Sequence, residues 1–251
     1  MEIKVLSKAL GILEFIASRR GVPTLAPELL RSMPDLTQPT CVRLLKTLCK
    51  AGYLEQLSRQ KGYVLGPLAY YLGNASSYRE ELVSVARPAL VEFAAKYGQS
   101  ILLTVRHGDF RTIPFGINTP TGIKLDLSRA RYCDLTLSST GRLLLSMMSE
   151  KEQQSFFVRY GLPQGDCWPE NVSIKDVLSI LQKIKNQGTL VSYHSGRGAG
   201  AVPVKVDGRV EAALGCVWSD MHKLRENEFM TGLRLAAKKI SDTLSQGVAI
   251  G

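Results

Sequence analysis

Several kinds of motif are missing from this 251-residue chain. Its five cysteines are odd in number and widely scattered, and no two form a CxxC pair, which argues against both a disulfide framework and a structural zinc site. We therefore expect reduced, mostly buried thiols and no bound metal. No apolar stretch approaches the length that crosses a bilayer, and residues 1–4 lack the basic start of a secretion signal. These absences predict a cytoplasmic protein with no membrane partner.

Common enzyme signatures are missing as well. No GxSxG elbow is present, which disfavours one class of hydrolase. Gly196, Gly198 and Gly200 do not have GxGxxG spacing, and a strand is expected after them where a dinucleotide site needs a helix. The histidines occur singly, although a Cys/His nucleophile site could still assemble in three dimensions. The sequence therefore predicts no enzyme and no cofactor, with catalysis kept as an alternative.

Positive charge is concentrated near the start of the chain. The net charge is +10, and residues 1–70 carry ten cations against five anions, while the other 181 residues share the remaining +5. Dense positive charge favours a polyanionic partner such as DNA, although basic surfaces also serve solubility. The length and the 45% hydrophobic content fit two modest globular domains.

Residues 24–52 have the pattern of two helices joined by a turn. Thr24 precedes an apolar-periodic run and is expected to cap a short helix. Pro34 then breaks that helix, because it has no amide hydrogen. A second helix is expected from about Thr37, with Pro39 tolerated in its first turn.

The second helix is predicted to be amphipathic. Helical spacing places on one buried side Cys41, Leu44, Leu45 and Leu48. It leaves on the other side Gln38, Val42, Arg43 and Lys46. Gly52 supplies the left-handed residue that ends the helix, and two short strands, 53–56 and 62–65, are then expected around a polar tip at residues 58–61.

Two interpretations of this stretch remain. One is a small helical subdomain whose cations are merely solvated. The other is a DNA-reading head, favoured because amide, hydroxyl and guanidinium groups at a helix start reach base edges and phosphates. In that interpretation the second helix lies in the major groove with Lys46 on phosphate, and the hairpin tip contacts flanking backbone or the minor groove. The predicted DNA-binding residues are Thr37, Gln38, Thr40, Arg43, Lys46, Arg59 and Lys61.

Four segments, residues 5–13, 36–48, 51–54 and 63–66, have an order and spacing that resembles the winged helix-turn-helix of the IclR (isocitrate lyase regulator) family of bacterial transcription regulators. The resemblance implies a double-stranded DNA operator as partner and a homodimer or homotetramer. A dimer that reads two half-sites is also expected physically, because one head offers too little contact for tight binding.

Strands and helices are interleaved in the rest of the chain, which predicts an α+β domain. Residues 66–81 predict a short helix with a polar break at 74–77, which we take as the linker. Helices are expected at 82–97 (stopped by Gly98), 139–149, 150–158, 173–187 and 226–244. Strands are expected at 101–105, 112–115, 189–193, 201–206 and 210–218, with turns at 107–109 and 206–209.

This second part also resembles the IclR family, whose C-terminal effector domain has a GAF-like fold. The matching segments are residues 135–146, Gly188, 201–204, Gly208 and 212–214. The resemblance implies a pocket for a small, usually anionic metabolite, with Ser139, Thr140 and Gly141 at a helix start and Ser192 and Ala199 on the opposite wall. Unpaired amides at a helix N-terminus beside two hydroxyls suit a carboxylate, although such a helix start is more often a plain cap.

Residues 192–198 depart from the family pattern. Where the family usually has an acidic run, this chain has a shorter segment with His194 and Arg197, which favours a more negative ligand if the segment lines the pocket. Two alternatives stay open. The regulator binds no effector, or it is controlled by oxidation of Cys133 or Cys216.

The sequence thus predicts an α+β protein with three parts. These are a winged helix-turn-helix DNA-binding domain at residues 1–66, a linker helix at 67–81, and a GAF-like effector-binding and oligomerisation domain at 82–251. The expected function is sequence-specific regulation of transcription, controlled by a small anionic metabolite such as a carboxylate.

Overall fold

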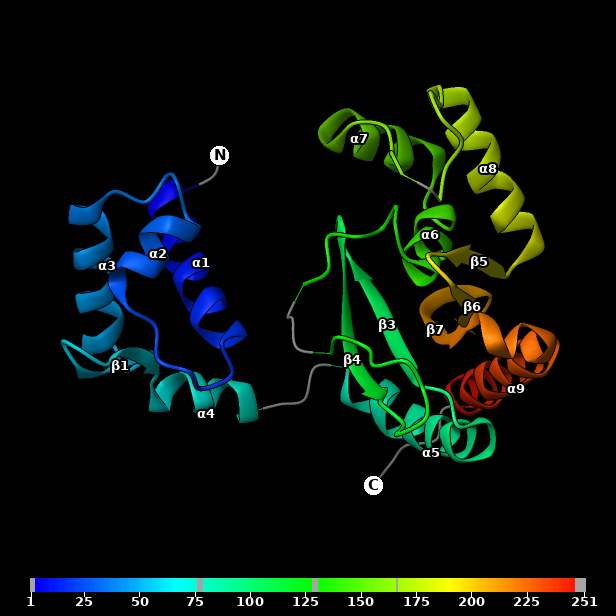
Figure 1. The fold of residues 1–251 in the computed structure, drawn as a ribbon, viewed down its shortest axis with the longest axis horizontal. Coiled ribbons are helices and arrows are strands. Elements are labelled where there is room, and N and C mark those ends of the chain that lie inside the picture. Colours follow the sequence, from blue (N-terminus) through cyan, green and yellow to red (C-terminus); the bar gives the residue numbers. More distant parts are fainter. Residues whose placement is uncertain (1–2, 76–78, 128–130, 166, 247–251) are drawn as a thin grey trace. The chain divides into compact units, whose positions relative to one another are not determined.

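The contacts within the chain divide it into two compact units, Met1–Tyr78 and Arg79–Gly251 (Figure 1). The computed structural model describes residues 3–75, 79–127, 131–165 and 167–246. Among these residues, no helix combines the length and the apolar character that a membrane crossing requires.

The first unit is a winged helix-turn-helix, as the sequence predicts. Its elements are α1 (Lys4–Ser18), α2 (Ala26–Ser32), α3 (Gln38–Lys50), β1 (Leu54–Ser58), β2 (Gly62–Leu65) and α4 (Pro67–Ala75). Its small core joins α1, α2 and α3 through Ile12, Ile16, Leu29, Cys41 and Leu45. Strands β1 and β2 pair antiparallel and form the hairpin, or wing.

The start of α2 differs from the prediction. The N-cap residue is Leu25, and its amide donates to the Glu28 carboxylate at 2.8 Å, so that glutamate satisfies the helix start. Thr24 does not cap the helix, because its backbone pairs with Tyr63 in both directions (2.9 and 2.8 Å) and its side chain is buried. Gly62 permits this approach, since a Cβ there would lie 2.4 Å from the Thr24 carbonyl oxygen.

Helix α3 begins and ends as predicted. Thr37 holds the N-cap position, Pro39 lies in the first turn, and Gly52 has a φ of 79° just after the helix. The Thr37 hydroxyl, however, pairs with the Thr40 hydroxyl at 3.0 Å and does not cap a backbone amide. The helix is therefore held by its buried stripe and leaves both hydroxyls at its outer start.

The second unit is built on a five-stranded antiparallel sheet of order β4-β3-β7-β6-β5. Its strands are β3 (Ile101–His107), β4 (Phe110–Ile117), β5 (Leu190–His194), β6 (Arg197–Val206) and β7 (Arg209–Ser219). Its helices are α5 (Glu80–Tyr97), α6 (Ser139–Ser146), α7 (Glu150–Tyr160), α8 (Ile174–Gln187), the 3-10 helix η1 (Asp220–Arg225) and α9 (Glu226–Ser245). This mixed architecture is the predicted α+β fold.

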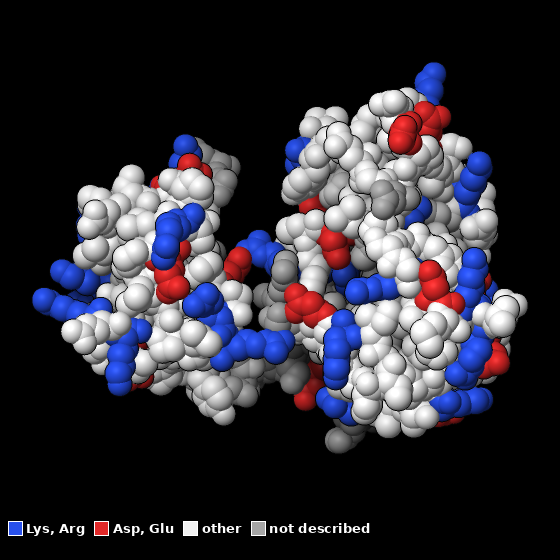
Figure 2. Space-filling view, viewed as in Figure 1, with Lys and Arg blue, Asp and Glu red and all other residues white. Residues whose placement is uncertain are grey.

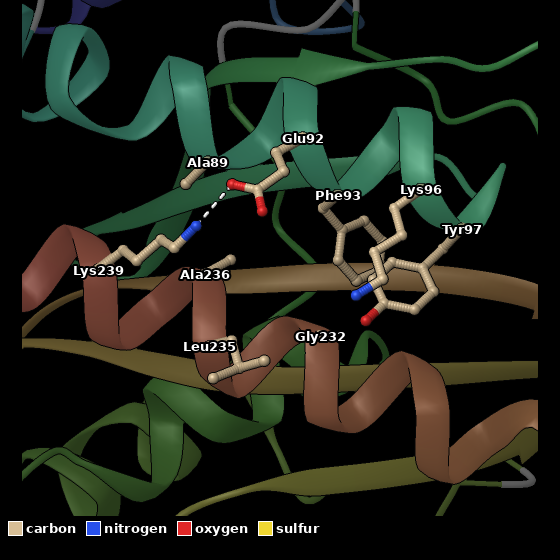
Figure 3. Close-up of a pocket in the computed structure, with 9 residues that line it drawn as sticks. All are labelled: Ala89, Glu92, Phe93, Lys96, Tyr97, Gly232, Leu235, Ala236 and Lys239. Carbon is tan, nitrogen blue, oxygen red and sulfur yellow. Dashed lines mark hydrogen bonds and ion pairs between the residues drawn. The ribbon is translucent and has the colours of Figure 1, made fainter.

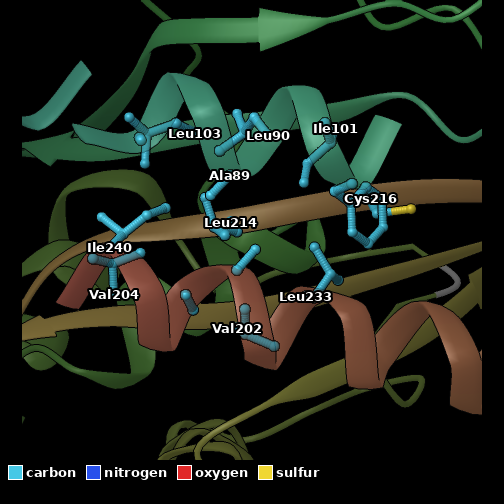
Figure 4. Packing of buried hydrophobic residues seen from close by; sticks show 14 of the residues in the cluster. Ala89, Leu90, Ile101, Leu103, Val202, Val204, Leu214, Cys216, Leu233 and Ile240 are labelled. Carbon is cyan, nitrogen blue, oxygen red and sulfur yellow. The ribbon is translucent and has the colours of Figure 1, made fainter. Parts of the chain in front are cut away.

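Side chains that alternate along the strands separate two hydrophobic layers. On one face, Leu103, Val202 and Leu214 pack with Leu90 of α5 and Leu233 of α9 (Figure 4). On the other face, helices α6, α7 and α8 form a second cluster around the sheet. The start of α6 is therefore held directly against the sheet.

Several helices and strands begin or end at residues other than those predicted, and each difference has a local cause. Strand β6 begins four residues earlier than expected, because Ser195 and Gly196 have φ values of 48° and 73° and close a two-residue hairpin. Helix α6 ends at Ser146, since Ser149 starts the capping box of α7. The predicted linker break also fails in part, because α4 continues through Ala75. The other half of that break, Ser76 and Ser77, lies outside the described residues.

Candidate DNA-reading face and effector cavity

The outer face of α3 carries the residues predicted to contact DNA. Its buried stripe, Cys41, Leu45 and Leu48, packs into the core, while Leu44 is only partly buried. This arrangement turns the opposite face to solvent. The predicted residues are exposed at Thr37, Gln38, Arg43, Lys46, Arg59 and Lys61, and half-buried at Thr40.

The cations of this face are not engaged in ion pairs within the described chain. No salt bridge there involves Arg43, Lys46, Arg59 or Lys61. The wing tip is held by its backbone, since the Lys61 amide donates to the Ser58 hydroxyl at 3.0 Å. Figure 2 shows Lys and Arg side chains projecting along the edge of the first unit where α3 and the wing lie. Unpaired exposed cations of this kind are available to phosphate groups.

Helix α1 presents apolar side chains to solvent. Ile3, Leu6 and Leu10 are 60%, 53% and 49% exposed and lie at helical spacing. They stand apart from Ile12 and Ile16, which fill the core of the unit. A row of exposed apolar side chains on one helix is unusual for a surface that stays in water.

The second unit contains a cavity of about 240 Å³ between the start of α6 and the sheet. Four of the five predicted effector residues, Ser139, Thr140, Ser192 and Ala199, line it. The Ser139 hydroxyl donates to the Ala199 carbonyl at 3.2 Å and lies 2.6 Å from the Ser192 hydroxyl. These two hydrogen bonds tie the three elements α6, β5 and β6 together at the cavity wall.

Gly141 is not among the lining residues of this cavity. The true N-cap of α6 is Ser138, whose hydroxyl accepts the Gly141 amide at 3.1 Å. A Cβ at Gly141 would lie 2.7 Å from that hydroxyl and 2.8 Å from the Asp134 carbonyl oxygen. The glycine therefore allows close packing of the helix start, and its amide is not available to a ligand.

Two arginines, Arg111 and Arg197, and His194 also line the cavity. His194 and Arg197 flank the β5–β6 turn, so the segment that departs from the family pattern does reach this site. Arg111 of β4 is only 5% exposed and forms a fork with Asp134, Nε to Oδ1 at 2.7 Å and Nη2 to Oδ2 at 2.6 Å. No sequence motif marks Arg111, because its partner lies 23 residues away across a loop.

The remaining wall of the cavity is largely apolar. It includes Leu102, Leu125, Leu137 and Val217. Such a lining around a few convergent polar groups is typical of a small-molecule site. Within the described residues, no group of three or more His, Cys, Asp or Glu side chains could hold a metal ion.

The cysteines are all free, and only Cys41 and Cys216 are buried, so the expectation of mostly buried thiols was wrong. Cys216 borders the cavity, but its side chain packs in the α5–α9 cluster, where burial raises the pKa of its thiol (Figure 4). A thiol that resists ionisation is a poor redox sensor. Cys133 is exposed, and Cys167 is half-buried in the cavity wall.

A second hollow lies between α5 and α9 (Figure 3). Its volume is only about 80 Å³, and a Glu92–Lys239 ion pair of 2.6 Å spans it. Tyr97 lies over Gly232, where a Cβ would come within 2.4 Å of the ring. This hollow is a product of close helix packing and is too small for a metabolite.

The chain thus combines a winged helix-turn-helix with an α+β unit that contains a cavity, an arrangement that suits a one-component transcription regulator. The model of the family described as "Bacterial transcriptional regulator IclR C-terminal" matches residues 75–242, well over half of the chain. The chain therefore belongs to the IclR family of bacterial transcriptional regulators.

Curated relatives of this chain are repressors. The HTH-type transcriptional repressor AllR of Escherichia coli K12 is 23% identical over 161 residues, and the acetate operon repressor of Salmonella typhimurium is 25% identical over 171 residues. Each match covers 64% of this chain and 59% of the relative, so it spans about three fifths of the relative's length. AllR of Salmonella typhi is 24% identical over 249 residues, with 96% of this chain and 90% of that protein covered.

Solved structures share the fold over the whole chain. An IclR homolog from Microbacterium hydrocarbonoxydans, complexed with 4-hydroxybenzoate, has a TM-score of 0.78 at 20% identity, covering 97% of this chain and 100% of its own. The IclR transcriptional regulator from Alicyclobacillus acidocaldarius has a TM-score of 0.75 at 20% identity, covering 98% and 99%. At these identities the likeness establishes the fold alone.

Proposed function

We propose that this chain is a sequence-specific DNA-binding regulator of transcription whose DNA affinity is controlled by a small carboxylate. The observation that carries the proposal is the cavity at the start of α6, which is lined by a pair of hydroxyl groups, by Arg111 and Arg197, and by His194. The repressor relatives favour a regulator over an enzyme. Because its partner is DNA, we place the protein in the cytoplasm.

The DNA contact is proposed for the exposed face of α3. Gln38, Thr40 and Arg43 would approach base edges in the major groove, beside Thr37 at the helix start, and Lys46 would contact phosphate. Arg59 and Lys61 would contact the flanking backbone or the minor groove. The exposure of the α3 face and its unpaired cations support this docking.

Two copies are proposed to bind one operator. The exposed apolar side chains of Leu6 and Leu10 on α1, and of Ile3 just before it, offer a surface that a second copy could cover. A homodimer would then present two α3 helices about one turn of DNA apart or a multiple of it. A homotetramer would pair two such dimers.

The effector is proposed to be a small carboxylate with an apolar body. The cavity volume of about 240 Å³ lies just below the usual range of ligand sites, roughly 300–1,000 Å³. A carboxylate would lie at the start of α6 beside Ser139 and Ser192, where helix polarity favours an anion. Arg197 adds positive charge to this site, and Arg111 and His194 offer N–H groups to a ligand. 4-Hydroxybenzoate, bound by a structural neighbour, has this chemistry and is the first probe to use.

A thermal-shift screen of small carboxylates, 4-hydroxybenzoate included, tests the effector proposal. Binding to the folded state stabilises by about 2.7 kcal/mol at a concentration of 100 Kd, so a ligand raises the melting temperature of the wild-type chain. Ser139→Ala should reduce that shift, because it removes the hydroxyl at the cavity wall. Ser84→Ala is the matched control, since the Ser84 hydroxyl donates to the Glu81 carbonyl of its own helix at 2.9 Å and Ser84 does not line the cavity. A hit that is unaffected by Ser139→Ala would place the ligand elsewhere, and turnover of a hit would favour an enzyme.

A further inference from the structure

Arg142 of α6 is a buried cation without a carboxylate partner in the described residues. It is 7% exposed, and no salt bridge among those residues includes it. Its guanidinium stacks on the Trp168 ring at 4.9 Å, and its Nε has no hydrogen-bond acceptor. Burial lowers the pKa of Arg142, but an arginine remains charged in proteins. A buried charge of this kind favours the appearance of a negative charge beside it.

The Cys167 side chain interacts with this guanidinium. The contact with Cys167 raises the pKa of Arg142, against the effect of burial. The Cys167 thiol donates to the Leu137 carbonyl at 3.5 Å, and the next side chain, Trp168, donates its indole N–H to the Thr136 carbonyl at 2.7 Å. The first bond positions the sulfur, and the second holds the neighbouring Trp168 ring. Because Cys167 is half-buried and lines the 240 Å³ cavity, small solutes that enter the cavity can reach it.

We propose that Cys167 is the reactive thiol of this chain and a site of reversible oxidation by hydroperoxides, with Arg142 as the residue that stabilises the anionic sulfur. A neighbouring guanidinium and partial exposure are the surroundings of reactive cysteines. The two alternatives named from the sequence differ from Cys167: Cys216 is buried in the core, and Cys133 is exposed and does not line the cavity.

The chemistry is a two-electron transfer. The thiol proton leaves to solvent, and the thiolate attacks one oxygen of the hydroperoxide. The O–O bond breaks with its electron pair on the departing oxygen, which takes up a proton and leaves as water or an alcohol. Sulfur is oxidised to a sulfenic acid, and in its anionic form this group pairs with the Arg142 guanidinium. The new oxygen lies in the cavity wall, where it would oppose an anionic effector; this last consequence alone rests on the proposed function.

The test uses the full chain at neutral pH with limiting hydrogen peroxide, a sulfenate-specific carbon nucleophile as the trap, and peptide mass spectrometry to report each cysteine separately. Cys133 is the internal reference, because it is more exposed than Cys167. We expect trapping at Cys167 to be at least about tenfold faster than at Cys133. An equal or slower rate at Cys167 would overturn the proposal, whether or not the chain binds DNA.

Two variants then test the role of Arg142. Arg142→Met keeps an unbranched side chain on Trp168 but removes the charge, so trapping at Cys167 should fall toward the Cys133 rate. Arg142→Lys keeps a positive charge and should restore most of the wild-type rate. An unchanged Cys167 rate in a folded Arg142→Met chain would contradict the assignment. If Arg142→Met does not fold, the wild-type comparison of Cys167 with Cys133 still decides the proposal.

Discussion

Two arginine–aspartate forks in the second unit have the same geometry but different burial. Arg111 binds Asp134 at 2.7 and 2.6 Å, and Arg159 binds Asp109 at 2.9 and 2.8 Å. The Arg111 side chain is 7% exposed, whereas that of Arg159 is 49% exposed. The two pairs thus form a matched set in which burial is the main difference.

Asp134→Asn should be strongly destabilising. It leaves the charge of Arg111 buried without its counterion, and among the described residues the Nη1 of Arg111 already has no hydrogen-bond acceptor. Breaking a buried pair from one side costs about 3–5 kcal/mol, and the partial exposure of Asp134, 26%, favours the lower end. For a unit of this size, about 2–4 °C are lost per kcal/mol, so the melting temperature should fall by roughly 10 °C. Asp109→Asn should be close to the wild type, because exposed pairs contribute little.

Urea unfolding, monitored by tryptophan fluorescence, measures the free energy of unfolding of the wild type and of both variants. The chain has two tryptophans, Trp168 and Trp218, and both are buried in the second unit. The signal therefore reports that unit and is insensitive to unfolding of the first. Equal losses for Asp134→Asn and Asp109→Asn would refute the argument from burial, as would a larger loss for Asp109→Asn.

Three further predictions concern the head, the α7 cap and the α6 start. Arg43→Ala should weaken binding to a selected operator by about 1–3 kcal/mol and relax base preference, whereas Lys61→Ala should weaken all duplexes alike and flatten the salt slope in anisotropy titrations; intact base preference in Arg43→Ala would contradict the docking of α3. Hydrogen bonds from the Ser149 amide and hydroxyl lower the pKa of Glu152 from its usual value of 4.5. The ionised carboxylate therefore stabilises the fold above pH 4.5, and this stabilisation is lost as the pH falls through the lowered pKa. The difference in unfolding free energy between the wild type and Glu152→Gln should accordingly shrink in acid. A stability gap that widens in acid would reverse this sign. Gly141→Ala should lower the melting temperature, because three atoms lie within 2.8 Å of the added Cβ; an unchanged value would mean that the helix start shifts freely.

Local signals in the sequence account for most of the elements. The spacing of Cys41, Leu45 and Leu48, with Pro39 and Gly52 at the ends, was enough to place α3 within a residue. The hairpin at 206–209 followed from Asp207 and Gly208, which have φ values of 49° and 77°.

Contacts between distant residues account for what the sequence did not reveal. Thr24 was assigned as a cap, but pairing with Tyr63, 39 residues later, takes it into the core. Arg111 was missed at the cavity, because only the folded loop brings Asp134 to it. Gly198 and Gly200, which resemble part of a phosphate loop, instead leave room for the Trp218 ring across the sheet. In all three cases, contact with a residue that is distant in the sequence determines the structural role.

The central claim is that a ligand in the cavity at the start of α6 changes how the chain holds DNA. The direct measurement is the affinity of the full chain for an operator selected from random duplexes, with and without a saturating concentration of the carboxylate that stabilises it most. Since coupling between sites typically amounts to 1–3 kcal/mol, the account predicts an affinity change of about 5–150-fold that Ser139→Ala diminishes. An identical affinity in both conditions, with the ligand bound, would contradict it.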